Sequence, residues 1–236
     1  MKIEIWSDVM CPFCYIGKRK FEAALEKFAN KDEIAIEWKS FQLMPELKTD
    51  TARKSDEFLA EEKGVTLEHA RAMNGHASQM ARDAGLTFNF DKAIPANTFN
   101  AHRLIHFAKS QGKQDLAEEA LFRAYFTEGE NIDDIDTLAK LGATIGLDGT
   151  SIRTMLQSGN FANDVRQDIH ESQQLGVRGV PFFVFDRKYA VSGAQASEVF
   201  QQVIQKSFTE WREENPAAKL NIASEGGVCT PGGKCD

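Results

Sequence analysis

The 236-residue sequence lacks an excess of basic residues, and it lacks any long apolar run. Lys and Arg number 28 against 35 Asp and Glu, so the formal net charge is -7, which argues against a nucleic-acid or anionic-membrane partner. No stretch approaches the roughly 18 apolar residues of a membrane-spanning helix. Glu4 and Asp8 interrupt what would be the apolar part of a secretion signal, so we expect a cytoplasmic protein.

Cysteine is scarce and unevenly placed. The four cysteines form one close pair near the start, Cys11 and Cys14, and another near the end, Cys229 and Cys235. This pattern differs from the disulfide framework of a small secreted domain, in which bridges join distant segments. In a reducing compartment a close pair is more often redox-active or metal-binding, so the pattern favours one of these two chemistries.

The order of predicted elements is that of an α/β protein interrupted by helices. Residues 2–7 predict a strand that runs through the first cysteine pair into a helix, and residues 34–41 predict a second strand. In such a strand–helix–strand context a Cys-x-x-Cys pair indicates a thioredoxin-like fold. Apolar periodicity then predicts only helices as far as residue 159, followed by one more helix, a hairpin from residue 182 and a closing helix over 196–211.

These elements predict three regions. Residues 1–50 and 160–213 would form the thioredoxin-like domain, and residues 51–159 a large inserted all-helical domain. Residues 214–236 have few large apolar side chains, so we expect a mobile tail that carries the second cysteine pair.

Cys11 lies where the first predicted strand gives way to a helix. The free N–H groups and the positive dipole at a helix start stabilise a thiolate there, and Lys18 and Arg19 would add to this field if they face the same way. Cys14 lies one turn later and can resolve a mixed disulfide on Cys11. Pro12 is tolerated in the first turn, where its missing N–H has no intrahelical role. A structural disulfide or half of a zinc site is the alternative.

A second signal is Val180-Pro181, directly before the predicted hairpin. A cis peptide bond there would expose the backbone of Val180 for pairing with an extended substrate opposite Cys11. A proline at the start of a strand is common by itself. Together with the Cys11–Cys14 pair it is far more specific.

The segments around these residues resemble a known family. Residues 6–17 (WSDVMCPFCYIG), 41–45 (FQLMP) and 176–185 (GVRGVPFFVF) resemble the DsbA-type thioredoxin family, in particular its cytoplasmic FrnE-like branch. The resemblance extends over nearly the whole chain. It implies a thiol–disulfide oxidoreductase of the oxidase or isomerase type that needs no bound cofactor, with Cys11 as nucleophile, Cys14 as resolving thiol and Pro181 as the cis-proline.

The same resemblance predicts the substrate face and the partners. Pro12, Phe13 and Val180 would contact the substrate, which would be a disulfide- or thiol-bearing protein. Glutathione or thioredoxin is a candidate electron donor. The FrnE-like group also carries an additional cysteine pair near its C-terminus, which Cys229 and Cys235 would match.

Two departures from the family pattern limit which properties of the family we expect in this chain. DsbA has a histidine where this chain has Phe13, which donates no hydrogen bond, so we expect a weaker oxidant than DsbA. The buried carboxylate of the family lies six residues before the nucleophile, where this chain has Ile5. We therefore hypothesise that Asp8 or a water accepts the proton of Cys14.

Two further groups of residues leave alternatives open. Cys229 and Cys235 are either a second redox pair that exchanges electrons with Cys11–Cys14, or a local disulfide without function, with a four-cysteine zinc site as a minor alternative.

His102 and His106 have metal-ligand spacing on a predicted helix, but no third ligand accompanies them in the sequence, so a packing or surface role is favoured.

The main functional rival shares the expected fold. Kappa-class glutathione transferases and 2-hydroxychromene-2-carboxylate isomerases have the same insertion, but they generally replace the nucleophilic cysteine with serine and keep no resolving cysteine. The presence of Cys11 and Cys14 argues against this class. A non-catalytic chaperone-like binder is the third class, and its activity would survive Cys11→Ser.

Overall fold

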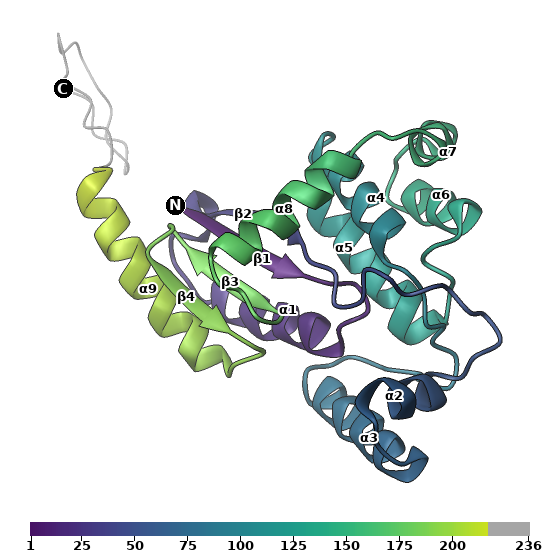
Figure 1. Cartoon of the computed structure of the whole chain (residues 1–236). Helices are drawn as coiled ribbons and strands as arrows, with labels where there is room; N and C mark the ends of the chain where they lie inside the picture. Colours follow the sequence, from purple (N-terminus) through teal and green to yellow (C-terminus); the bar gives the residue numbers. More distant parts are fainter. Residues whose placement is uncertain (217–236) are drawn as a thin grey trace, which may run out of the picture.

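A computed structural model describes residues 1–216; Cys229 and Cys235 lie outside the described residues. The centre of the fold is a four-stranded sheet in the order β2–β1–β3–β4 (Figure 1). Strand β2 runs parallel to β1, whereas β3 is antiparallel to both β1 and β4. The strands are β1 (Lys2–Ser7), β2 (Ala35–Ser40), β3 (Phe182–Phe185) and β4 (Tyr189–Ser192).

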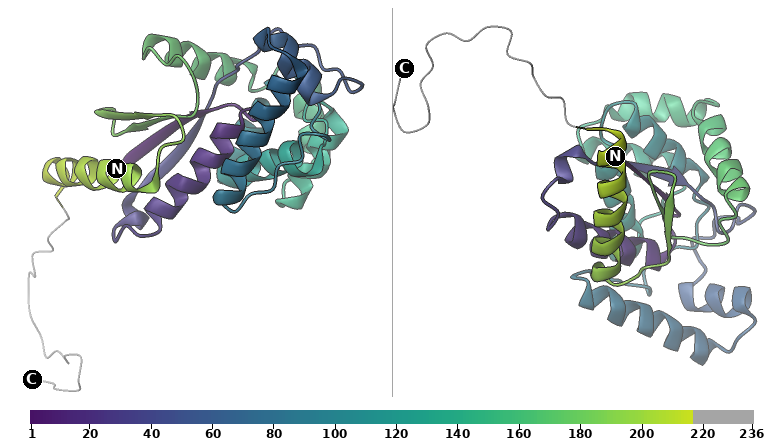
Figure 2. Two further views of the ribbon diagram at one scale, coloured as in Figure 1. Left: turned by 90° about the horizontal axis from the view of Figure 1, so that it is seen from below. Right: turned by 90° about the vertical axis from the view of Figure 1, so that its left-hand side faces the viewer.

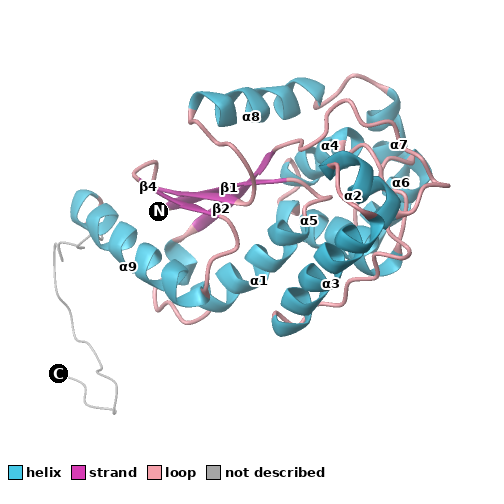
Figure 3. Ribbon diagram, turned by 60° about the horizontal axis from the view of Figure 1, so that its bottom comes forward, coloured by secondary structure: helices cyan, strands magenta, loops and turns pink. Residues whose placement is uncertain are grey.

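Three helices cover the two faces of this sheet. Figure 3 shows α8 on one face, with α1 and α9 on the other. Because both faces are covered, residues 3–7 of β1 are all buried, including Glu4, which pairs with Arg187. The predicted hairpin is confirmed, since Asp186 and Arg187 adopt positive φ angles of 49° and 56° in the turn between β3 and β4. The covering helices are α1 (Pro12–Leu25), α8 (Ala162–Gln174) and α9 (Ser197–Glu214).

Between residues 51 and 159 the chain forms helices and loops and adds no strand to the sheet. These helices gather beside one end of the sheet (Figures 1 and 2). A single 3₁₀ turn, Lys31–Glu33, precedes β2, and a π-helical turn, Ala124–Glu128, follows α5. The helices of this segment are α2 (Ser55–Lys63), α3 (Leu67–Asp83), α4 (Phe99–Lys109), α5 (Gln114–Arg123), α6 (Ile135–Thr144) and α7 (Gly149–Gln157).

Helix α5 docks on the open edge of the sheet. Strand β2 is an edge strand, and its outward backbone groups would be unpaired. The side-chain amide of Gln114 accepts a hydrogen bond from the Trp38 N–H at 3.1 Å and donates one to the Trp38 carbonyl at 2.8 Å. The inserted helices are therefore bonded to the sheet close to the ends of β1 and β2.

None of the helices within residues 1–216 combines the length and the apolar character that crossing a bilayer requires.

Candidate active site

Cys11 is the N-cap residue of α1. Its backbone N–H donates to the Asp8 carbonyl at 2.9 Å, which closes the turn between β1 and the helix. The first helical turn consists of the uncharged residues Pro12, Phe13 and Cys14, so the positive end of the helix dipole faces Cys11 without a neighbouring acid on that turn. Both cysteines are free thiols. Cys11 therefore lies at the start of the helix, as the sequence predicted.

Both cysteines are buried. Cys11 is 4% exposed and Cys14 is 1% exposed. The reason is the segment before β3, because the Cys11 thiol donates to the Val180 carbonyl at 3.5 Å and that segment covers it. The Val180–Pro181 peptide bond is cis.

The sheet register explains why Cys11 and Val180, which are 169 positions apart, meet. Trp6 of β1 pairs with Phe182 of β3, and since the strands are antiparallel, Pro181 lies at the carboxyl end of β1. Helix α1 starts from that same end. Gly17 permits the close approach, because a Cβ at this position would lie 3.0 Å from Cγ of Pro181.

Two exposed apolar side chains lie on segments next to the turn that carries Cys11. Phe13 and Leu43 are 39% and 45% exposed. The Leu43 N–H donates to Oδ2 of Asp8 at 2.7 Å, which holds the segment after β2 beside the turn that carries Cys11. The side chain of Phe13 is therefore accessible from solvent, and its role in substrate binding stays a prediction.

Lys18 and Arg19 do not extend the positive field toward Cys11. Lys18 is 2% exposed and is paired with Glu22, Asp115 and Glu119. Arg19 is paired with Glu22 and Glu119. Carboxylates thus neutralise both cations, and their role is to join α1 to α5.

A cluster of buried polar side chains lies behind the cysteine pair. The Ser7 hydroxyl donates to Oε1 of Glu118 in α5 at 2.8 Å. Nε2 of His102 in α4 lies 3.4 Å from Oδ1 of Asp8. All four side chains are at most 2% exposed, so the end of β1 and two inserted helices form one polar cluster. We call Ser7, Asp8, His102 and Glu118 the buried cluster.

Burial shifts the pKa of several groups in and beside this cluster. Burial, followed by contact with Cys11, raises the pKa of the Cys14 thiol well above its usual value, although the Asp8 backbone and the Ser7 hydroxyl face its sulfur and oppose the shift. Burial raises the pKa of Glu118 to about 7, against the opposing effect of His102 and Ser7. Burial disfavours charge on His102, but Asp8 and Glu118 outweigh this effect and raise its pKa.

Comparison with known proteins identifies the family to which this site belongs. The DSBA-like thioredoxin domain family matches residues 2–205. The chain belongs to this family. The chain is 30% identical to the uncharacterised protein YwbO of Bacillus subtilis over 204 residues. These residues are 86% of this chain and 94% of the relative.

Solved DSBA-like structures have the same architecture. A probable DsbA oxidoreductase of Streptomyces coelicolor is 34% identical, with a TM-score of 0.83 over 100% of this chain and 98% of its own. The cytosolic disulfide reductase DsbM of Pseudomonas aeruginosa is 15% identical, with a TM-score of 0.64 over 89% of this chain and 100% of its own, and it shows the shared fold. The thioredoxin-like fold with helices inserted between β2 and α8 is therefore confirmed.

His102 and His106 of α4 each face a different buried aspartate. His102 faces Asp8, whereas Nε2 of His106 lies 3.1 Å from Oδ2 of Asp168 and 3.1 Å from the Ser40 hydroxyl. Both are buried, so they have a packing role and do not lie on the surface. Each histidine ties α4 to a different part of the thioredoxin-like sheet.

Glu118 is the site residue that sequence reasoning missed. Our hypothesis for the Cys14 proton named Asp8, but the Asp8 carboxylate is directed at Leu43 and His102. The carboxyl that reaches Cys14 through Ser7 is Glu118. No local pattern distinguishes Glu118 from its neighbour Glu119, which is 31% exposed and pairs with Arg19.

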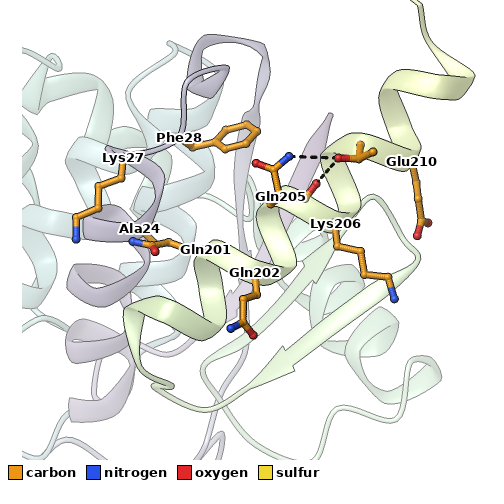
Figure 4. A pocket seen from close by; sticks show the side chains of 9 residues that line it. Ala24, Lys27, Phe28, Gln201, Gln202, Gln205, Lys206 and Glu210 are labelled. Carbon is orange, nitrogen blue, oxygen red and sulfur yellow. Dashed lines mark hydrogen bonds between the residues drawn. The ribbon is translucent and has the colours of Figure 1, made fainter.

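A groove of about 670 Å³ lies between α1 and α9, away from the cysteines (Figure 4). Its walls are Ala24 near the carboxyl end of α1, Phe28 in the segment that follows α1, and a row of Gln residues from α9. Cys11 lies at the opposite, amino end of α1. The groove is therefore not part of the DSBA-like site.

Proposed function

We propose that the chain catalyses thiol–disulfide exchange on disulfide- or thiol-bearing proteins in the cytoplasm, with Cys11 as nucleophile and Cys14 as resolving thiol. The observation that carries the proposal is the placement of Cys11. Its sulfur lies at the start of α1, 3.5 Å from the Val180 carbonyl before the cis Pro181, with Cys14 buried one turn behind. An attacking thiol, a backbone edge for the substrate and a second thiol are thus in one place.

The reaction proceeds in two exchanges. The Cys11 thiolate attacks one sulfur of a substrate disulfide, the S–S bond breaks, and the other substrate sulfur leaves as a thiolate that takes a proton from water. The Cys14 thiolate then attacks the Cys11 sulfur, which releases the second substrate thiolate and leaves a Cys11–Cys14 disulfide. Two electrons pass from the pair to the substrate, and the reverse sequence oxidises a substrate dithiol.

The surroundings of Cys11 favour an extended polypeptide substrate. Phe13 offers an exposed apolar contact beside the sulfur, and Pro12 and Val180 flank it on α1 and on the segment before β3. We propose an oxidase- or isomerase-type role without a bound cofactor. Reducing or oxidising equivalents would come from a partner such as glutathione or thioredoxin. DsbM, which shares the fold, has itself been solved with GSH.

A glutathione redox titration tests this function, with alkylation and mass spectrometry of each cysteine. A Cys11–Cys14 potential near the roughly -120 mV of DsbA would indicate an oxidant, one near about -270 mV a reductant, and an intermediate value an isomerase. Cys11→Ser should abolish exchange, and Cys14→Ser should stop the reaction at a mixed disulfide on Cys11. If Cys11 and Cys14 do not form a disulfide at any redox potential of the glutathione buffer, the proposal is wrong.

The activities of the same two variants distinguish the rival functions. Glutathione conjugation or isomerisation would persist in Cys14→Ser, because neither reaction needs a resolving thiol. A chaperone-like binder would keep its activity in Cys11→Ser. The mass spectra also report whether Cys229 and Cys235, which lie outside the described residues, oxidise together with the first pair.

A further inference from the structure

The buried cluster joins the inserted helices to the cysteine pair. We propose that the inserted segment supplies the proton acceptor of the resolving step. Glu118 of α5 takes the proton of Cys14 through the Ser7 hydroxyl. His102 of α4 is the positioning residue, which keeps Glu118 in the ionised form that can accept a proton. This inference rests on the proposed thiol–disulfide exchange and deepens it.

Ser7 connects the carboxyl to the surroundings of the thiol. Ser7 is the last residue of β1, and its hydroxyl donates to Oε1 of Glu118 at 2.8 Å and lies close enough to Cys14 to act on the pKa of that thiol. Cys14 and Ser7 are each 1% exposed. Bulk water is therefore excluded, and a proton leaving Cys14 needs a group within the protein to receive it.

A hydroxyl can transfer a proton in either direction along this path. When Glu118 is ionised, Ser7 donates to it and presents its lone pairs to the Cys14 S–H. When Glu118 is protonated, the carboxyl donates to Ser7, and Ser7 donates to the Cys14 thiolate. The two arrangements are the start and the end of one proton transfer.

The charge on His102 controls this carboxyl. Among the described residues, Nε2 of His102 and Oδ1 of Asp8 have no hydrogen-bond partner, and they face each other at 3.4 Å. Asp8 favours the imidazolium form of His102, and that positive charge opposes the effect of burial on Glu118. Without His102, Glu118 would ionise only at a higher pH.

The other charged groups around the cluster come from every element packed against it. Glu118 is also influenced by Lys18 of α1 and Asp115 of α5. His102 also faces the backbone of Phe41 after β2. Tyr125 of the π-helical turn is buried near Asp8, and burial and that carboxylate raise its pKa, so it stays neutral. Cys14 has Cys11 as its titratable neighbour.

The resolving step transfers one proton and exchanges one disulfide bond. The Cys14 S–H gives its proton to Oγ of Ser7 while the Ser7 hydroxyl proton moves to Oε1 of Glu118. The Cys14 thiolate attacks the Cys11 sulfur of the mixed disulfide, the Cys11–substrate bond breaks, and the substrate leaves as a thiolate. Glu118 keeps this proton until the Cys11–Cys14 disulfide is reduced again, when Cys14 leaves as a thiolate and takes the proton back through Ser7.

Glu118→Gln with Glu119→Gln as its matched control tests the acceptor. Reduced full-length protein is mixed with hydroxyethyl disulfide, quenched with acid, alkylated and measured by mass spectrometry over pH 5.5–9. We expect Glu118→Gln to form the mixed disulfide on Cys11 at the wild-type rate but to resolve it about 100-fold more slowly, the lower end of what a positioned base contributes. Glu119→Gln should resolve it as wild type does.

His102→Gln with His106→Gln as its control tests the positioning role. The two histidines occupy one helix and each faces a buried aspartate, but only His102 belongs to the cluster. We expect the pH midpoint of the resolving step to rise by about one unit in His102→Gln. The midpoint should stay unchanged in His106→Gln.

The outcomes separate this inference from the proposed function. If wild type forms no mixed disulfide, the proposed function itself fails. If Glu118→Gln slows formation and resolution equally, or if it resolves at the wild-type rate, Glu118 is not the acceptor. If both histidine variants shift the midpoint alike, His102 has only a structural role and its positioning function is refuted.

Discussion

The Ser7 hydroxyl donates to Oε1 of Glu118 across 111 positions of sequence. This bond connects the carboxyl end of the central strand β1 to the inserted helix α5. Ser7 also faces the Cys14 sulfur. The inserted helices therefore reach the surroundings of the cysteine pair, and the proposed proton transfer uses this connection.

Ser7→Ala removes the hydroxyl between Cys14 and Glu118. We expect the mixed disulfide on Cys11 to form at the wild-type rate and to be resolved about tenfold more slowly, because a relay group is lost while the carboxyl remains. Rapid acid quench with mass spectrometry measures both rates. Ser40→Ala is the control, since Ser40 ends the neighbouring strand and its hydroxyl contacts His106. Resolution at the wild-type rate in Ser7→Ala would exclude the path through Ser7.

Glu118 and Glu119 should affect stability with opposite pH dependence. The pKa of Glu118 is about 7 in the folded chain, because of burial, against an ordinary value of 4.5. Between these values the folded state keeps a proton that the unfolded state has released, so the free energy of unfolding falls as the pH rises. Relative to wild type, Glu118→Gln should gain about 3 kcal/mol between pH 4.5 and 7.5.

Glu119 gives the opposite sign in the same experiment. Burial disfavours its charge, but Arg19, Tyr15 and Lys18 outweigh burial and lower its pKa. Its stabilising effect is present above the unfolded pKa and is lost as the pH falls through the folded pKa. Glu119→Gln should therefore be less stable than wild type at pH 7, with a difference that shrinks in acid. Urea unfolding at a series of pH values measures both variants, and parallel pH curves for the two would contradict the assignment.

Two helical glycines should respond differently to alanine. A Cβ at Gly17 would lie 3.0 Å from Cγ of Pro181, so Gly17→Ala forces α1 or the segment before β3 to move. We expect a loss of about 1 kcal/mol in stability and slower exchange at Cys11. Among the described residues no atom lies within 4 Å of a Cβ at Gly75 of α3, so Gly75→Ala should gain about 0.5–1 kcal/mol. Thermal unfolding and exchange rates of the two variants provide the comparison.

Phe13→His should make the Cys11–Cys14 disulfide a stronger oxidant. Phe13 is 39% exposed, so an imidazole fits there without disturbing the core. A histidine on the first turn donates a hydrogen bond to the Cys11 thiolate, and stabilising the thiolate stabilises the reduced form. Equilibration with glutathione measures the potential, with Phe13→Leu as the apolar control. A potential that stays equal to that of wild type would show that residue 13 does not set the oxidising power.

The sequence alone was sufficient to predict the fold and the position of the cysteine pair in it. The strand over residues 2–7, the hairpin at Asp186-Arg187 and the helical character of residues 51–159 all follow from local periodicity and turn chemistry. The exact helix starts depend on more than local sequence. Asp148 caps α7, and Asp134 caps α6 although Asp133 precedes it. Adjacent acidic residues are equally good caps, and tertiary contacts decide between them: Asp133 accepts from Thr49 and Asn100 instead.

Local patterns determined Cys11, Cys14 and Pro181, because the spacing of two cysteines on one helix turn and a proline before a strand are properties of neighbouring residues. Tertiary structure alone decided the rest of the site. Glu118 and Glu119 are adjacent in sequence, yet α5 turns one toward Ser7 and the other toward Arg19. The physical reason is that a carboxyl acquires its pKa from burial and from the charges packed around it, and those neighbours come from strands and helices about 100 residues away.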